Sequence, residues 1–165
     1  NWHQKRISKL IVNKLFGTVS GKKICILGFA FKANTNDTRE SAAINICKDL
    51  IDEGAILYIH DPKVTSEQIS EVLDIGKNKD NEIYDKSKHP HEGSWCFIKD
   101  ISDGFNGTDA VVILTEWKDY YHINWELASK QMRKPSWVFD TRSIINSQDI
   151  KKYGLNLWKI GDGTQ

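Results

Sequence analysis

The chain alternates between short runs of apolar residues and longer segments in which apolar residues recur at helical spacing. The short runs are rich in β-branched residues, and turn-forming or polar residues bound them, which is typical of buried strands. They are "KICILGF" (residues 23–29), "AILYIHDP", "WCFIK", "DAVVILT", "SWVFD" and "LNLWKIG". Helices are predicted between them at residues 41–53 and 65–73, around "ISDGFNG", in pieces over 117–132, and at "SQDIKKYG". Strands separated by helices throughout predict the α/β class, with a doubly wound, mostly parallel sheet of about six strands.

An amphipathic helix is predicted ahead of the first strand. Its apolar face carries Ile7, Leu10, Ile11 and Leu15, and its other face carries Lys and Arg. The composition changes after residue 17, and the sheet region starts near Gly21. A helix in this place has no required position in the sheet, so it is interpreted as an arm, a linker to another domain or a dimerisation element. The chain starts at Asn1 rather than at methionine, which suggests a fragment of a longer protein.

Composition narrows the function classes. The 165 residues match the length of one domain with one core. Lys plus Arg total 23 against 22 Asp plus Glu, so no global charge favours nucleic acid or an anionic membrane. No apolar run approaches the ~20 residues of a membrane span. The three cysteines, Cys25, Cys47 and Cys96, are odd in number and widely spaced, as expected for reduced thiols of a cytoplasmic protein, and no spacing typical of a metal site occurs.

Several polar and aromatic features receive structural interpretations. Residues 76–93 are charged and have no period, so they are predicted to form an exposed insertion, in which His89 and His91 are solvated rather than metal ligands. The pair "DP" at Asp61 is interpreted as a turn, because the glycine fingerprint of a dinucleotide site is missing. Four tryptophans are interpreted as core or rim residues: Trp117, Trp125, Trp137 and Trp158.

The stretch "GFAFKANTNDTRES", residues 28–41, lies where an open α/β sheet binds ligands, between a strand end and a helix N-terminus. A phosphate in this place would meet backbone N–H groups, the positive end of the helix and the charges of Lys32 and Arg39. The structural alternative is that Asp37, Thr38 and Ser41 cap the helix and that the two cations are solvated loop charges. The residues alone leave the two interpretations about equal.

The same stretch resembles the segment that opens the C-terminal domain of UDP-glucose dehydrogenases, with the pattern G-F-[AT]-F-K-x-x-T-x-D-x-R-x-S. In the same order, "NWHQKR" resembles the end of the family's long central helix, and "DEGA", "HDPKV", "AVVILTEW" and "FDTR" resemble later segments. The resemblance covers nearly the whole chain and is weakest between residues 64 and 100. It implies a Rossmann-like C-terminal domain at residues 21–165, preceded at residues 1–20 by the end of the central dimerisation helix.

The resemblance implies a division of labour in the parent enzyme, an NAD-dependent dehydrogenase that converts UDP-glucose into UDP-glucuronate. The N-terminal domain, missing from this chain, would carry most of the NAD site and the catalytic cysteine, and the parent enzyme is expected to be a homo-oligomer. In this chain, Phe31, Lys32 and Arg142 would bind the UDP-sugar, and Arg39 would reach NAD across the cleft. The fragment would hold no catalytic residue and would be inactive alone.

Two further residues have structural alternatives. Arg142, in "FDTR", could form a surface pair with Asp140, although its place after a strand end favours the ligand site. The family often has Gly where this chain has Thr141, and Asn or Arg where it has Ser143. Glu116, in "TEW", could touch the cleft or cap the next helix. The segment "GSWCFIKD" is superficially similar to the family's catalytic "GGSCFxKD". The catalytic segment precedes the central helix, whereas this segment follows it, so Cys96 is interpreted as a buried strand residue.

Other function classes remain open from the sequence. A free-standing nucleotide-binding or regulatory module would use the same crevice without catalysis. A structural protein would use the first helix for dimerisation and the sheet as a scaffold. Within the family, GDP-mannose and UDP-N-acetyl-mannosamine are alternative substrates, although "TRES" and "TEW" favour UDP-glucose.

Overall fold

The computed structural model describes residues 2–73 and 93–161, which form one six-stranded parallel sheet. The strand order is β3-β2-β1-β4-β5-β6, and every neighbouring pair is parallel. The strands are β1 (Lys23–Leu27), β2 (Ile56–His60), β3 (Ser94–Phe97), β4 (Ala110–Ile113), β5 (Trp137–Asp140) and β6 (Asn156–Lys159). The predicted α/β class and the six predicted strands are confirmed.

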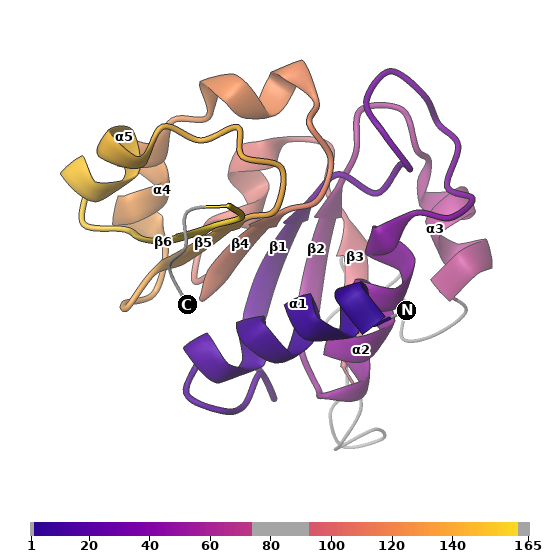
Figure 1. Cartoon of the computed structure of the whole chain (residues 1–165), viewed down its shortest axis with the longest axis horizontal. Coiled ribbons are helices and arrows are strands. Elements are labelled where there is room, and N and C mark those ends of the chain that lie inside the picture. The colour runs from indigo at the N-terminus through magenta and orange to yellow at the C-terminus, as the bar shows by residue number, and fades with distance from the viewer. Residues whose placement is uncertain (1, 74–92, 162–165) are drawn as a thin grey trace.

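Helices connect the strands, as the alternating pattern predicts. They are α1 (Trp2–Lys14), α2 (Ala42–Asp52), α3 (Ser66–Leu73), α4 (Trp125–Gln131) and α5 (Ser147–Lys152), with short 3₁₀ turns η2 (Ile101–Gly104) and η3 (Lys118–His122). α1 and α2 lie together in front of the strands in Figure 1. The sheet is buried between its helical layers: β4, for example, has no exposed residue. This explains why the strands read as continuous apolar runs rather than as alternating ones.

α1 contributes to the core of the same domain. Ile7, Ile11, Leu15 and Val19 are buried, and α1 packs against α2. Burying these side chains stabilises the fold by roughly 1.5–3 kcal/mol each. In this chain α1 is therefore no free arm, whereas its role in a dimer remains a prediction.

The helix boundaries follow local chemistry that the sequence displays. Ser41 caps α2 by accepting the amide of Ala43 at 3.2 Å, and Thr65 forms a capping box with Gln68, whose amide donates to the Thr65 hydroxyl at 3.2 Å. Gly54 ends α2 with a φ of 91°, the left-handed conformation that glycine adopts without strain. The proposed capping of α2 by Ser41 is thus confirmed.

Other predictions divide between the described and undescribed parts of the chain. Trp117 and Trp125 are buried, whereas Trp137 and Trp158 are half-buried against the core, so the interpretation as core or rim residues is confirmed. The insertion predicted at residues 76–93 lies, except for its last residue, outside the described residues, as do His89 and His91. In the described ranges, no helix is long and apolar enough to cross a membrane.

The strand order places the reversal of the sheet between β1 and β4. In sheets of this kind, ligands bind outside the carboxyl ends of the strands at the point where the order reverses. The loop after β1, residues 28–41, rises above these strand ends at the upper right of Figure 1. The fold therefore directs attention to the loops that follow β1, β4 and β5.

Candidate functional site

The loop after β1 starts at a glycine that no other residue could replace without a rearrangement. Gly28 has a φ of 99°, and a Cβ added to it would lie 2.4 Å from the Cβ of Thr115, just after β4. The Thr115 hydroxyl also donates to the carbonyl oxygen of Ala30 at 3.0 Å. The two chain segments are thus in direct contact at the point where the strand order reverses.

The carboxylate of Asp61, which directly follows β2, anchors this loop by accepting hydrogen bonds. One carboxylate oxygen accepts the amides of Phe29 and Ala30 at 2.8 and 3.0 Å and the indole N–H of Trp117 at 3.2 Å. The other oxygen accepts the amides of Lys63 and Val64, both at 2.8 Å. The predicted turn at Asp61 is confirmed by these last two bonds. The sequence analysis missed the other three bonds, which make this buried carboxylate the anchor of the loop.

The far side of the loop is closed by two further contacts. The Ser41 hydroxyl, which caps α2, also donates to the carbonyl oxygen of Phe29 at 2.8 Å. The amide of Phe31 donates to the carbonyl oxygen of Asp37 at 2.7 Å. The backbone of the loop is therefore fixed on both sides, and the side chains of Phe31, Lys32 and Arg39 between these contacts are exposed.

Three predicted site residues lie on this exposed part. Phe31 is 46% exposed, which is unusual for a large apolar side chain, and Lys32 is exposed beside it. Arg39 binds Asp37 of its own loop in a bidentate ion pair, with a shortest distance of 2.9 Å and a guanidinium side chain that is 88% exposed. The hydrogen bonds from Arg39 lower the pKa of Asp37 to about 2. Asp37 thus holds Arg39 instead of capping α2, so only Ser41 of the three proposed caps has that role.

The fourth predicted site residue, Arg142, follows β5. Its Nε donates to Oε2 of Glu116 at 2.5 Å, and both side chains are 36% exposed. The predicted alternative, a surface pair with Asp140, is wrong because the Asp140 side chain is fully buried. Its carboxylate instead accepts the amides of Arg142, Ile144 and Ile145 at 3.1, 2.8 and 2.8 Å.

Glu116 joins the loops at this edge of the sheet. Burial acts to raise its pKa, but the hydrogen bond and charge of Arg142, its own amide and the amide of Ala33 outweigh burial, so its pKa lies below the usual value. The side chain does not cap the following turn η3, whose first residue is preceded by Trp117 without a side-chain cap. Glu116 therefore pairs with Arg142, and the alternative of a helix cap is wrong.

The three cysteines are unsuited to nucleophilic catalysis. Cys25, Cys47 and Cys96 are buried and free of disulfides. Burial raises the pKa of all three thiols, to about 12 for Cys25 and about 11 for Cys96. A nucleophilic cysteine needs an exposed, low-pKa thiolate. The interpretation of Cys96 as a buried strand residue is confirmed.

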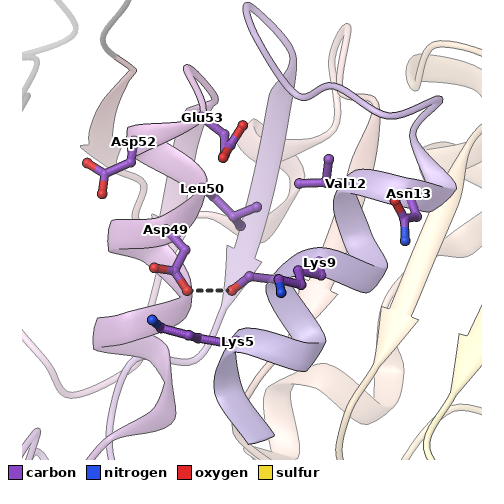
Figure 2. A pocket seen from close by; sticks show the side chains of 9 residues that line it. Lys5, Lys9, Val12, Asn13, Asp49, Leu50, Asp52 and Glu53 are labelled. Atoms are coloured by element: carbon purple, nitrogen blue, oxygen red, sulfur yellow. Dashed lines mark hydrogen bonds between the residues drawn. The ribbon is translucent and has the colours of Figure 1, made fainter. Parts of the chain in front are cut away.

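The hollows of the surface include one beside the loop after β1 and one between helices. A hollow of about 390 Å³ is lined by Asn34, Thr35, Asn36 and Lys63 and by none of the predicted site residues. A second, of about 360 Å³, lies between α1 and α2, and its lining includes Lys5 and Lys9 on one side and Asp49, Asp52 and Glu53 on the other (Figure 2). In it, Ser8 donates to Asp49 at 3.0 Å. No predicted site residue lines the second hollow, which belongs to the packing of the two helices. Within residues 2–73 and 93–161, no group of three His, Cys, Asp or Glu side chains is placed to hold a metal ion.

The chain is similar to known proteins of one family. A family model described as the UDP-binding domain of the UDP-glucose/GDP-mannose dehydrogenase family matches residues 25–147. Among curated relatives, UDP-glucose 6-dehydrogenase of Bos taurus is 40% identical over 169 residues, and that of Drosophila melanogaster is 37% identical over 161 residues. The matches cover 98% and 97% of this chain but 32% of each relative. The chain thus spans about a third of the length of these proteins.

Two solved structures share the fold. An NDP-N-acetyl-D-galactosaminuronic acid dehydrogenase from Methanosarcina mazei Go1 superposes with a TM-score of 0.69 at 19% identity, covering 96% of this chain and 28% of the other. A UDP-glucose dehydrogenase from Pyrobaculum islandicum gives a TM-score of 0.65 at 24% identity, covering 90% of this chain and 28% of the other. At these identities the structural likeness establishes the fold.

Proposed function

The chain belongs to the UDP-glucose/GDP-mannose dehydrogenase family, and from this premise we propose that it is the C-terminal part of an NAD-dependent UDP-glucose 6-dehydrogenase. In this proposal it contributes one wall of a UDP-sugar site, and the parent enzyme oxidises UDP-glucose to UDP-glucuronate. The observation that supports the proposal is that Lys32 and Arg142 follow the carboxyl ends of β1 and β5, on the edge of the sheet where ligands of this fold bind. The identity of 40% to a UDP-glucose 6-dehydrogenase favours this sugar over other nucleotide sugars.

The chemistry of the two cations suits an anionic ligand. Arg142 presents a planar guanidinium that matches the two oxygens of a phosphate or carboxylate, whereas Lys32 presents a mobile point charge. Charge-assisted hydrogen bonds of this kind contribute about 1.5–3 kcal/mol each. The exposed ring of Phe31 next to Lys32 offers an apolar surface to the same ligand. These three residues bind and orient the substrate, and none of them performs a chemical step.

The parent reaction also needs NAD, and one residue of this chain fits it. When bound, the nicotinamide supplies the hydride acceptor. Arg39 holds Asp37 through Nε and one terminal nitrogen, which leaves its other terminal nitrogen for a phosphate oxygen. Arg39 therefore serves as a cofactor-binding residue, and the rest of the NAD site lies in the part of the parent that this chain does not contain.

Catalysis is assigned to the remainder of the parent enzyme. None of the three cysteines of the chain is exposed, so the chain supplies no thiolate nucleophile. The isolated chain is expected to bind UDP-sugars weakly, because half of the contacts that would offset the entropic cost of association are missing. We also expect the parent to be a homo-oligomer. The long helix whose last part is α1 would form part of the contact between its subunits.

The test is titration of UDP-glucose and UDP-glucuronate into the chain, followed by two-dimensional NMR. Shifts are expected at residues 29–41 and 140–143, and they should disappear in Lys32→Ala and Arg142→Ala. Lys130→Ala is the matched control, because this exposed lysine lies on α4 near the opposite edge of the sheet. In the full-length enzyme, Lys32→Ala should raise KM for UDP-glucose at least tenfold, which corresponds to ~1.4 kcal/mol.

Two results would contradict the proposal. A full-length parent that forms NADH with GDP-mannose but not with UDP-glucose would show that the sugar is assigned wrongly. UDP binding at the strand ends without any sugar-dependent NADH formation by the full-length parent would favour a nucleotide-binding or regulatory module.

A further inference from the structure

Glu116 occupies the centre of the candidate site although no ligand contact is assigned to it. It lies three residues after the end of β4, between the loop after β1 and the loop after β5. Its carboxylate accepts Nε of Arg142 on one side, and the amide of Ala33, next to Lys32, stabilises it on the other. One side chain thus connects the three loops that surround the reversal of the sheet.

The way in which Glu116 holds Arg142 leaves the guanidinium ready for a ligand. The bond uses Nε, and the two terminal nitrogens of Arg142 donate no hydrogen bond to any described part of the chain. A guanidinium that is fixed through Nε keeps its two terminal N–H groups as a fork, the geometry that binds phosphate or carboxylate oxygens in pairs. A long arginine side chain without such a support loses rotamer entropy when it binds.

We propose that Glu116 is a positioning residue of the UDP-sugar site. It fixes the Arg142 guanidinium and holds it in a constant position relative to the loop that carries Lys32. The inference rests on the proposed function and deepens it. Glu116 differs from the buried anchor Asp61, because it is partly exposed and supports a binding side chain rather than buried amides. An exposed pair of this kind contributes only ~0–1 kcal/mol to folding, so its removal leaves the fold intact.

The opposite interpretation makes a different prediction. If the Glu116 carboxylate mainly neutralised Arg142 and competed with the anionic ligand, its removal would strengthen UDP-sugar binding. If Glu116 positions Arg142, its removal weakens binding, and the loss depends on Arg142 being present. A double-mutant cycle therefore separates the two.

The experiment uses steady-state kinetics of the full-length parent enzyme with UDP-glucose. Glu116→Ala is expected to raise KM for UDP-glucose about tenfold, with a change of less than about threefold in kcat and in KM for NAD. Glu116→Gln keeps an oxygen acceptor for Nε and should raise the same KM only about two- to threefold. In the Arg142→Ala background, Glu116→Ala should change KM by less than about twofold. Glu126→Ala, which removes another partly exposed paired carboxylate, is the matched control and should change nothing.

A second measurement reports on positioning without relying on activity. In the 165-residue chain, the Nε–H resonance of Arg142 should be resolved and protected in the wild type and averaged with solvent in Glu116→Ala. An unchanged resonance would overturn the proposal, and so would a lower KM in Glu116→Ala or additive effects in the cycle. If the resonance changes as expected while the parent ignores UDP-glucose, the proposed function fails and the positioning of Arg142 by Glu116 stands.

Discussion

The loop after β1 and the loop after β5 are both fixed at a strand end, but by residues at different separations along the chain. Each begins at a strand end and is held by a buried aspartate that accepts backbone amides. The first loop is held by Asp61, which directly follows the neighbouring strand β2, whereas the second is held by Asp140, the last residue of its own strand. The first depends on the tertiary register of the sheet, and the second is mostly a local turn.

The side chains show the reverse arrangement. In the first loop, Arg39 is tied to Asp37 two residues away, and Lys32 faces solvent. In the second loop, Arg142 is tied to Glu116, which follows a different strand. The comparison teaches that the backbone of a loop and its arginine are anchored separately. In the loop after β1, a residue distant in the sequence holds the backbone and a neighbouring residue holds Arg39. In the loop after β5, a neighbouring residue holds the backbone and a distant one holds Arg142.

The largest expected effect concerns the distant anchor. Asp61→Ala leaves four backbone amides and one indole N–H without their acceptor. Each buried donor left unsatisfied costs about 1–3 kcal/mol, but water reaches some of them when the loop opens, so the expected loss in the free energy of unfolding is about 3–5 kcal/mol. Urea denaturation followed by circular dichroism measures it.

Asp140→Ala is the matched change in the second loop. It removes the acceptor of three backbone amides, whereas Asp61→Ala removes the acceptor of five donors. All three amides belong to residues within five positions of Asp140. The expected loss is about 2–3 kcal/mol, smaller than at Asp61. An equal or larger loss at Asp140 would contradict the distinction between a tertiary and a local anchor.

The ion pair between Arg39 and Asp37 leads to a prediction about pH. The hydrogen bonds from Arg39 lower the pKa of Asp37 to about 2, below its ordinary value of 3.8. A carboxyl group whose pKa is lower in the folded state stabilises that state above its unfolded pKa, so this contribution is complete above about pH 4 and is lost as the pH falls towards 2. The pair is exposed and screened by salt, so its effect on unfolding is small.

The measurement is a carboxyl carbon NMR titration of Asp37. A midpoint near 2 is expected in the wild type, and Arg39→Ala should return it towards 3.8. Arg142→Ala is the comparison variant, because its guanidinium belongs to the other loop and should leave the Asp37 midpoint unchanged. A wild-type midpoint near 4 would show that Arg39 is not held within its own loop.

The sequence was sufficient for those features that depend on burial and on neighbours along the chain. The apolar runs located all six strands because parallel strands covered on both faces need continuous apolar residues. Ser41 was among the proposed helix caps because capping depends on a residue only two or three positions away. Strand ends of a parallel sheet share one edge, so the placement of Lys32 and Arg142 on that edge followed from the pattern.

The contacts that the sequence did not predict join residues far apart in the chain. Trp117 and Asp61 are 56 positions apart, and Glu116 and Arg142 are 26 apart. Which carboxylate meets which donor depends on the order of the strands and on rotamers, neither of which leaves a periodic signal. This is why the sequence offered only the adjacent Asp140 as an alternative partner for Arg142, although backbone amides use the buried Asp140 side chain.

The last prediction tests how closely the second loop fits its sequence. Ser143 is exposed and has a φ of 58°, a left-handed conformation that Asn tolerates better than Ser and that β-branched residues disfavour strongly. Ser143→Asn should raise the free energy of unfolding by about 0.3–0.5 kcal/mol, or the melting temperature by ~1–2 °C, and Ser143→Val should lower that free energy by about 1–2 kcal/mol. Thermal denaturation of both variants beside the wild type measures the difference. If Asn and Val at this position gave the same melting temperature, the loop would relax around residue 143, and the anchoring of its backbone by Asp140 would be looser than its three hydrogen bonds indicate.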